Sequence, residues 1–200
     1  MNILVIHSHN ANRGDEAAVK AMVDELLIKY PGAKITISNN GFTPYPGMPE
    51  NIIQIDRFPK LESRMAQLEF FIVLLFKGKF AFTKEARKFI RALKEADVVL
   101  HAPGGPSIGD TYFKAEKLYL WRLNLIRRMG IPYIFYAPSM GPFNCTSRNK
   151  LRKEVISGAE RIILRDPISV KYVKDFLPGV EVEQALDSAL QHDIDIDKNE

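Results

Sequence analysis

Two stretches of the sequence combine small residues with side chains that can bind a ligand. In the first, Gly104 and Gly105 precede Ser107, and in the second Ser139 precedes Gly141. Small residues let a ligand approach the main chain, whose N–H groups can bind an anion or a sugar hydroxyl. A tight turn without a ligand explains the double glycine equally well, so both interpretations stay open. Ser139 lacks the flanking small residues of a hydrolase nucleophile.

The segment from residue 12 to residue 15 is a third candidate for ligand binding. It follows an apolar N-terminal run and precedes a helical pattern, so its N–H groups should lie at a helix N-terminus, which favours anions. Gly14 would let the backbone approach a ligand, and Asn12 can hydrogen-bond to a hydroxyl or a phosphate oxygen. Plain helix capping by Asn12 or Asp15 is the alternative. The second and third glycines of a dinucleotide fingerprint are missing.

Basic residues follow the second small-residue stretch. Arg148 and Arg152 lie near the start of a predicted helix, where either could point to a cleft and clamp a carboxylate or phosphate through two hydrogen bonds. A solvated basic face is the default interpretation of such a run. Further along the chain, Asp166 follows Arg165, and we favour Asp166 as a helix cap over a catalytic residue.

The four histidines and the single cysteine indicate neither a metal centre nor a disulfide. His7, His9, His101 and His192 match no metal-ligand spacing. His7 and His101 end apolar runs, so each either faces a cleft or is a hydrogen-bonded residue at a strand end. Cys145 has no partner for an internal disulfide, which favours a reducing cytoplasm, and it lacks the sequence signature of a nucleophile.

Predicted strands and helices alternate along the chain. Short apolar runs predict strands at residues 2–7, 34–38, 51–55, 161–164 and 180–183, and at the starts of 96–110 and 131–143. Helical patterns lie between them, one ending near residue 29 and the others at 61–76, 83–96, 112–129, 146–157 and 166–177. This alternation predicts an α/β fold, a Rossmann-like, doubly wound parallel sheet with helices on both faces. Ligands of such folds bind at the carboxyl ends of the strands, where both small-residue stretches should lie.

The composition is that of an ordinary soluble globular protein with a modest positive charge. Of 200 residues, 46% are hydrophobic and 26% are charged, and 28 basic against 24 acidic residues give a net charge of +4. This excess suits an anionic small molecule, and the basic residues lack the aromatic interleaving of nucleic-acid surfaces, so we expect no nucleic-acid partner. Residues 70–76 are continuously apolar but too few to span a bilayer. For them we favour a buried helix over a face that lies on a membrane or a partner.

The order of these motifs resembles the polysaccharide pyruvyl transferase family. The motifs are residues 12–15, 104–107, 139–143 and 164–166, followed by Ser169 and Asp187. The resemblance covers nearly the whole chain but only the N-terminal half of such proteins. It implies a glycosyltransferase-B-type architecture of two Rossmann-like halves, of which residues 1–190 would form one. Residues 191–200 would be an acidic tail or a truncated linker.

The resemblance also implies a reaction. Members of this family transfer pyruvate from phosphoenolpyruvate to two hydroxyls of a sugar, as a cyclic ketal, during synthesis of cell-surface polysaccharides. The partners would be this small-molecule donor and a glycan acceptor, without a cofactor or a metal. The protein would be cytoplasmic, and at the inner face of the membrane if its acceptor is lipid-linked. A homo-oligomer is left open.

Roles for single residues follow from the resemblance. Asp15 is expected as the base and Arg148 as the catalytic cation for phosphate or carboxylate. The expected substrate-binding residues are Asn12, Gly14, Gly104, Gly105, Ser107, Ser139, Gly141, Arg152 and Arg165. The histidine that donates a proton belongs to the family's other half, so this chain alone should be inactive or nearly so. Two alternatives remain, a glycosyltransferase-like enzyme that uses a nucleotide sugar and a non-catalytic homologue that binds a glycan or phosphorylated ligand.

Overall fold

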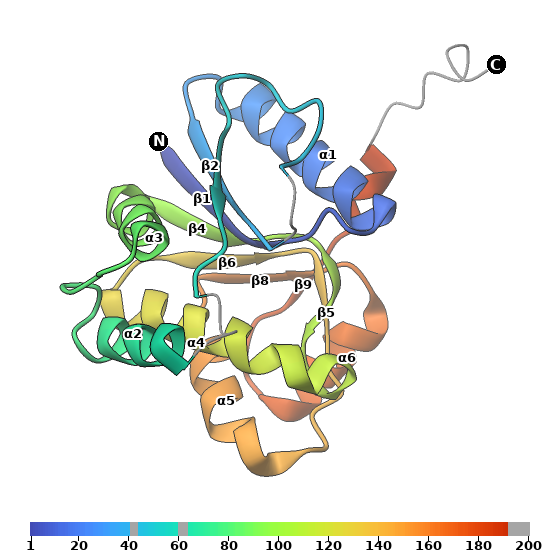
Figure 1. Cartoon of the computed structure of the whole chain (residues 1–200). Coiled ribbons are helices and arrows are strands. Elements are labelled where there is room, and N and C mark those ends of the chain that lie inside the picture. Colours follow the sequence, from blue (N-terminus) through green and yellow to red (C-terminus); the bar gives the residue numbers. More distant parts are fainter. Residues whose placement is uncertain (41–43, 60–63, 192–200) are drawn as a thin grey trace, which may run out of the picture.

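Seven parallel strands form the central sheet of the computed structural model, whose described residues are 1–40, 44–59 and 64–191 (Figure 1). The order in the sheet is β3-β2-β1-β4-β6-β8-β9. The strands are β1 (Asn2–Ser8), β2 (Lys34–Asn39), β3 (Ile53–Asp56), β4 (Val98–His101), β6 (Tyr133–Tyr136), β8 (Arg161–Leu164) and β9 (Glu183–Gln184). Every neighbouring pair is parallel, which confirms the predicted Rossmann-like, doubly wound α/β fold.

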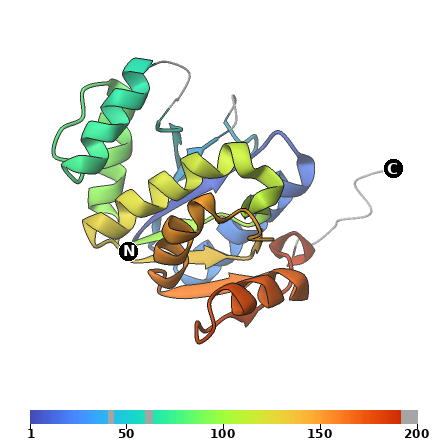
Figure 2. The ribbon, with the colours of Figure 1, turned by 90° about the horizontal axis from the view of Figure 1, so that it is seen from below.

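Helices cover both faces of this sheet (Figures 1 and 2). Helix α1 and the short turn η3 pack on one face, and α2 to α6 pack on the other. The helices are α1 (Arg13–Lys29), α2 (Arg64–Leu75), α3 (Lys84–Glu95), α4 (Phe113–Met129), α5 (Asn149–Ser157) and α6 (Pro167–Phe176). Three single turns are η1 (Asp110–Tyr112), η2 (Thr146–Arg148) and η3 (Ser188–Gln191).

The central strands are buried on both sides. In β1, Leu4 and Ile6 belong to the apolar cluster under α2 to α6, whereas Ile3 and Val5 belong to the cluster under α1. None of these four side chains is more than 2% exposed. Because both faces of β1 are buried, its sequence is a continuous run of apolar residues and not an alternation of apolar and polar residues.

Several helix ends follow from local signals that the sequence contains. Thr83 caps α3 by accepting a hydrogen bond from the N–H of Ala86, and Asp166 caps α6 by accepting one from the N–H of Ser169. Gly130 ends α4 in the left-handed conformation. These observations confirm the predicted caps, including the preference for Asp166 as a cap, because side-chain acceptors satisfy first-turn N–H groups that have no partner inside the helix.

Helix α2 is buried on one side only, which corrects the expectation of a buried helix at residues 70–76. Phe70 and Val73 are in the core, but Phe71 is 61% exposed and Leu75 is 51% exposed. The predicted start of this helix, at residues 61–63, lies outside the described residues, as do residues 192–200 of the predicted acidic tail. Within the described residues, no helix combines the length and the apolar composition that crossing a bilayer requires.

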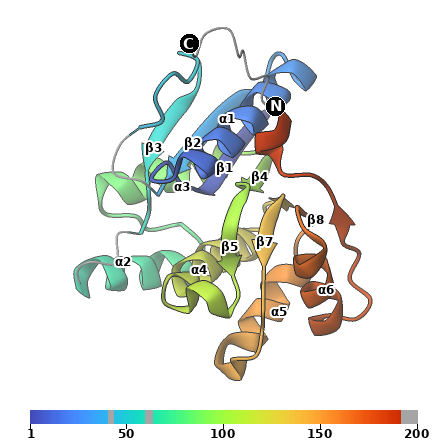
Figure 3. The same ribbon diagram turned by 90° about the vertical axis from the view of Figure 1, so that its right-hand side faces the viewer.

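The two small-residue stretches, which we expected to follow the predicted strands rather than to form strands themselves, make up a second, parallel sheet (Figure 3). Its strands are β5 (Gly104–Ile108), which contains the double glycine, and β7 (Pro138–Met140). Gly104 pairs with Pro138, and Ile108 pairs with Met140. Glycine and proline disfavour strands, but Ile108 and Met140 are both almost completely buried and hold the strand ends in the core. Tertiary packing therefore overrides the local preference for a loop.

The close approach of these two strands requires glycine at their exit. Gly109 follows β5 with φ of 137°, and a Cβ built on it would lie 2.6 Å from the carbonyl oxygen of Gly141. That atom is main chain and cannot rotate away. The absence of a side chain at Gly109 therefore allows the two strands of the second sheet to lie close together at this end.

The path of the chain creates a switch point between β1 and β4. From β1 the chain builds outward through β2 and β3, then returns to β4 on the other side of β1 and builds outward through β6, β8 and β9. The loops that leave β1 and β4 therefore diverge at the carboxyl edge. Open α/β sheets bind their ligands in the crevice that this divergence leaves.

We predict that Gly109→Ala destabilises the fold by about 2 kcal/mol or more, because the added methyl group meets the Gly141 main chain and the φ value is strained for alanine. The free energy of unfolding in urea measures this change. Gly32→Ala is the matched control, because a Cβ at Gly32 has no heavy atom within 4 Å. Equal stability of the two variants would contradict the proposed close approach.

Candidate functional site

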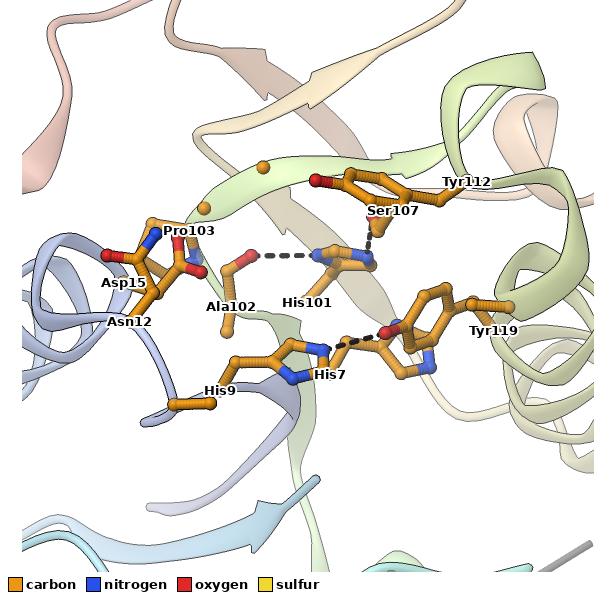
Figure 4. A pocket seen from close by; sticks show the side chains of 14 residues that line it. His7, His9, Asn12, Asp15, His101, Ala102, Pro103, Ser107, Tyr112 and Tyr119 are labelled. Atoms are coloured by element: carbon orange, nitrogen blue, oxygen red, sulfur yellow. Dashed lines mark hydrogen bonds between the residues drawn. The ribbon is translucent and has the colours of Figure 1, made fainter. Parts of the chain in front are cut away.

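A pocket of about 320 Å³ opens at the switch point of the sheet (Figure 4). Its volume is at the lower end of the range for small-molecule sites, about 300–1,000 Å³. The lining residues from β1 and the segment after it include His7, near the end of β1, and His9, Asn12 and Asp15. Those from β4, β5, η1 and α4 include His101, Gly104, Gly105, Ser107, Tyr112 and Tyr119. Asn12 and Asp15 lie at one side of the pocket in Figure 4, and both tyrosines lie at the opposite side.

His101 and Ser107 form a hydrogen-bonded pair inside this pocket. His101 Nδ1 is 2.8 Å from the carbonyl oxygen of Ala102, and His101 Nε2 is 2.7 Å from Ser107 Oγ. A carbonyl oxygen only accepts, so Nδ1 carries the proton and Nε2 accepts the hydrogen bond from the serine hydroxyl. The lone pairs of Ser107 Oγ are then available to accept a hydrogen bond from a ligand.

His7 and His9 continue the imidazole cluster toward α4. His9 Nε2 is 2.6 Å from the hydroxyl of Tyr119. The His7 ring packs edge-on against His101, with ring centroids 4.6 Å apart, and against Tyr119 at 4.4 Å. His7 is buried with φ of 61°, and neither of its ring nitrogens has a hydrogen-bond partner among the described residues. A strained backbone and an unpaired buried side chain together are typical of functional sites.

Burial keeps these histidines neutral. It is the largest cause that lowers the pKa of all three, and it lowers the pKa of His101 to about 4. The buried guanidinium of Arg122 further lowers the pKa of His7 and that of His9 by repulsion. At neutral pH the cluster therefore supplies hydrogen-bonding and stacking groups without a positive charge.

Asp15 is the one charged side chain among the described residues that line the pocket, once the histidines are neutral. It lies in the first turn of α1, where the helix dipole favours a carboxylate. Gly104 has φ of 139°, and a Cβ built on it would lie 2.9 Å from Asp15 Oδ1. The first glycine of the pair thus allows β5 to pass beside this carboxylate.

Asn12 is a helix cap that also lies at the pocket. Its side chain caps α1 by accepting a hydrogen bond from the N–H of Gly14 at 2.9 Å, and it also lines the pocket. Gly14 is exposed in the first turn of α1 and does not line the pocket. The capping interaction places Asn12 at the helix N-terminus beside Asp15.

Ser139, Gly141 and Arg165 line a different, shallow groove beside β7 and α6. Ser139 Oγ accepts a hydrogen bond from Arg165 Nε at 2.9 Å and donates one to Asp166 at 2.8 Å. Arg165 also forms an ion pair with Asp187 at 2.5 Å. The polar groups of this groove therefore bind one another and hold β7 against α6.

Arg152 lies in neither the pocket nor the groove, which differs from the expectation that it points to a cleft. Its side chain is completely buried and binds both oxygens of Glu116, at 2.7 and 3.0 Å. It also pairs with Asp110 at 2.8 Å and donates to the carbonyl oxygen of Cys145. A guanidinium that is used in this way is not available to a substrate in this structure.

Arg148 belongs to the same network. It pairs with Glu116 at 3.1 Å, donates to the carbonyl oxygen of Phe113 and stacks on the ring of that residue, with its guanidinium carbon 3.7 Å from the ring centroid. The side chain is 21% exposed and does not line the pocket.

Burial acts to raise the pKa of Asp110, but hydrogen bonds from the N–H of Cys145 and from Arg152 lower it overall. Asp110 is therefore a carboxylate beside Arg152.

The sequence did not single out three residues that the structure places at the pocket. Tyr112 and Tyr119 read as ordinary residues of a predicted helix, and no spacing set them apart. His9 was recognised only as a histidine without a metal pattern. Its position directly after a central strand was the one available signal, since that position lies at the ligand-binding edge of the sheet.

Fold and pocket together define the class of this protein, a Rossmann-like α/β domain with a pocket at its switch point. A family model described as polysaccharide pyruvyl transferase matches residues 12–199. The chain therefore belongs to the polysaccharide pyruvyl transferase family, a family of transferases in polysaccharide biosynthesis. This confirms the resemblance seen in the order of the sequence motifs. A comparison with curated proteins finds no match.

We predict that Arg152→Met destabilises the protein by about 3–5 kcal/mol, because it leaves Glu116 charged and buried without its main partner. Urea unfolding measures the loss. Arg161→Met is the matched control, since the pair of Arg161 and Glu183 is exposed and its removal should have little effect. Adding Glu116→Gln to Arg152→Met should recover part of the stability, because the buried charge disappears while the amide oxygen still accepts from Gly109. A double variant less stable than the single one would contradict this account.

We predict that His101 titrates well below neutral pH in the folded protein. Its pKa is about 4, against 6.5 in an unfolded chain, so the unfolded state binds the proton first. The free energy of unfolding should therefore fall as the pH is lowered between these values. Nuclear magnetic resonance of the imidazole measures the pKa directly. Ser107→Ala should leave this pKa low, because burial is its main cause, and titration of His101 near its ordinary value would contradict the prediction.

Proposed function

We propose that this chain takes part in transferring a pyruvyl group from phosphoenolpyruvate to two hydroxyls of a sugar in a cell-surface polysaccharide, and that its pocket binds the sugar. The observation that carries the proposal is the position of Asp15, a carboxylate in a pocket otherwise lined by neutral hydrogen-bonding and aromatic groups. Membership of the polysaccharide pyruvyl transferase family supports the reaction class. The choice of donor and the ketal product remain part of the proposal.

The chemistry of the pocket favours a sugar over the donor. Phosphoenolpyruvate carries phosphate and carboxylate charges, which need cations, and the described lining residues supply none. A sugar presents hydroxyls and apolar C–H faces instead. Asp15, Asn12 and Ser107 offer hydrogen bonds to hydroxyls, and the ring of Tyr112, which is 55% exposed, offers a flat surface for stacking.

The proposed reaction assigns a role to Asp15. The methylene carbon of phosphoenolpyruvate gains a proton, and the adjacent carbon becomes an electron-poor centre that both sugar hydroxyls attack. Two C–O bonds form, and the C–O bond to phosphate breaks. The two sugar hydroxyls release two protons. One of them balances the proton that the methylene carbon takes up, and the other leaves on phosphate. Asp15 accepts a hydroxyl proton in this scheme, and the N–H groups of Gly104 and Gly105 orient the sugar.

The donor in this proposal lies across the cleft from the pocket. Arg148 and Arg152, the cations expected from the sequence, bind Glu116 in this structure. Cations for phosphate and carboxylate, and the histidine that donates the proton, would then come from a second Rossmann-like half in a glycosyltransferase-B-type arrangement. Residues 1–190 would be the first half, in the cytoplasm where phosphoenolpyruvate is present, and would show little turnover without the second.

Ligand binding to the purified chain tests this proposal. Saturation-transfer nuclear magnetic resonance would compare methyl hexosides, phosphoenolpyruvate and a uridine diphosphate sugar as ligands. We expect a hexoside to bind, and Asp15→Asn to weaken it about tenfold or more, because a charged hydrogen-bond acceptor is lost. Asp24→Asn, an exposed carboxylate on the same helix, is the matched control and should have no effect.

Two results would contradict the proposal. Binding of the uridine diphosphate sugar in place of the hexosides, lost in Asp15→Asn, would favour a glycosyltransferase that uses a nucleotide sugar. Equal hexoside binding by Asp15→Asn and the unchanged chain would remove Asp15 from the acceptor site.

A further inference from the structure

An apolar surface covers the outward side of α2 and the segment that follows it. Its members are large hydrophobic side chains that are between 43% and 75% exposed. They are Met65, Leu68, Phe71, Leu75, Phe76, Phe80 and Phe82. Phe76 and Phe80 are in edge-to-face contact, with ring centroids 5.0 Å apart, so the surface is continuous from α2 into the loop. We call residues 64–95, with this surface, the α2–α3 corner.

The opposite side of α2 packs against the core of the protein. Phe70 stacks on Trp121 with ring centroids 5.7 Å apart and packs against Phe58, and both Phe70 and Val73 are in the core. The buried carboxylate of Glu69 accepts hydrogen bonds from the N–H groups of Phe82 and Thr83, which fixes the following loop. The exposed apolar residues of α2 therefore do not contribute to the core. Contiguous exposed apolar surfaces of this kind mark contact sites for proteins or membranes.

Positive charge is concentrated around this surface. Residues 64–95 contain eight of the 28 basic residues and three of the 24 acidic residues, of which Glu69 is buried. Lys84, Arg87, Arg91 and Lys94 recur on one side of α3 at three-and-four spacing. Four basic residues and one acid, Glu95, line a hollow beside Gly78. The basic residues are Lys79, Arg87, Arg91 and Lys94, and no ion pair between described residues involves them.

We propose that the α2–α3 corner docks on a membrane surface that contains anionic phospholipid. The phenylalanine and leucine side chains would enter the interface between headgroups and acyl chains, and the basic hollow would face headgroup phosphates. The corner projects from one end of the molecule, with α2 and α3 side by side, in both Figure 1 and Figure 2. A flat surface can therefore reach it without contacting α6 or η3.

The charges favour a membrane over a second copy of the chain. A two-fold dimer through this corner would place the same basic residues of two chains against each other, because both copies use the same surface. Like charges across an interface oppose association. An anionic membrane, in contrast, complements the apolar surface and its basic surroundings at once.

Vesicle co-sedimentation of the full chain tests this inference. We expect binding to vesicles of phosphatidylcholine mixed with phosphatidylglycerol, weaker binding to phosphatidylcholine alone, and a decrease as the salt concentration rises. Leu68→Asn with Phe71→Asn should weaken binding about tenfold or more, because two large apolar groups are lost. Arg87→Gln with Arg91→Gln, on the other helix, should abolish the preference for phosphatidylglycerol.

Matched control variants lie elsewhere on the surface. Ile28→Asn with Leu186→Asn changes two apolar residues that are each 74% exposed, and Lys150→Gln with Lys174→Gln removes two exposed charges. Circular dichroism confirms that all variants are folded. Equal weakening by the controls, or equal binding to both kinds of vesicle, would overturn the inference. A dimer in analytical ultracentrifugation that Leu68→Asn with Phe71→Asn dissociates, without vesicle binding, would assign the surface to a second copy.

Discussion

A buried arginine between two carboxylates holds together the carboxyl edge of this fold. Arg152 on α5 binds Glu116 on α4 and Asp110 at the exit of β5. Glu116 also accepts a hydrogen bond from the N–H of Gly109. The network thus joins two helices to the end of the strand that forms one wall of the pocket. Charges buried in this way are costly unless each is paired, so the three elements are held in one arrangement.

The pocket depends on a separation of charge. The side chains of Arg148 and Arg152 bind within the buried network and do not line the pocket, while burial keeps the three histidines of the pocket neutral. Among the described lining residues, Asp15 is left as the charged group at the cavity. A site of this kind suits the binding of hydroxyls and the removal of a proton better than the binding of a phosphorylated anion. This division is the physical basis for our proposal that this chain binds the acceptor sugar.

The fold was largely predictable because its signals are local. Continuous apolar runs indicated strands buried on both faces, and Thr83, Gly130 and Asp166 marked helix ends through their own backbone and side-chain chemistry. The second sheet was not predictable, since Gly104 to Ile108 has the composition of a loop. It is a strand because Ile108 and Met140 reach the core and bring it beside β7.

The sequence by itself determined the α/β class, the alternation of central strands and helices, and the family, because apolar periodicity, caps and the order of motifs are all properties of the linear chain. It also identified Asn12, Asp15, Gly104, Gly105 and Ser107 as candidates that the structure gathers at one pocket. Only the tertiary structure decided that Tyr119 and His9 join them and that Arg152 turns away. Which side chains meet across a sheet edge, and which charges neutralise one another, depends on contacts between residues far apart in the sequence.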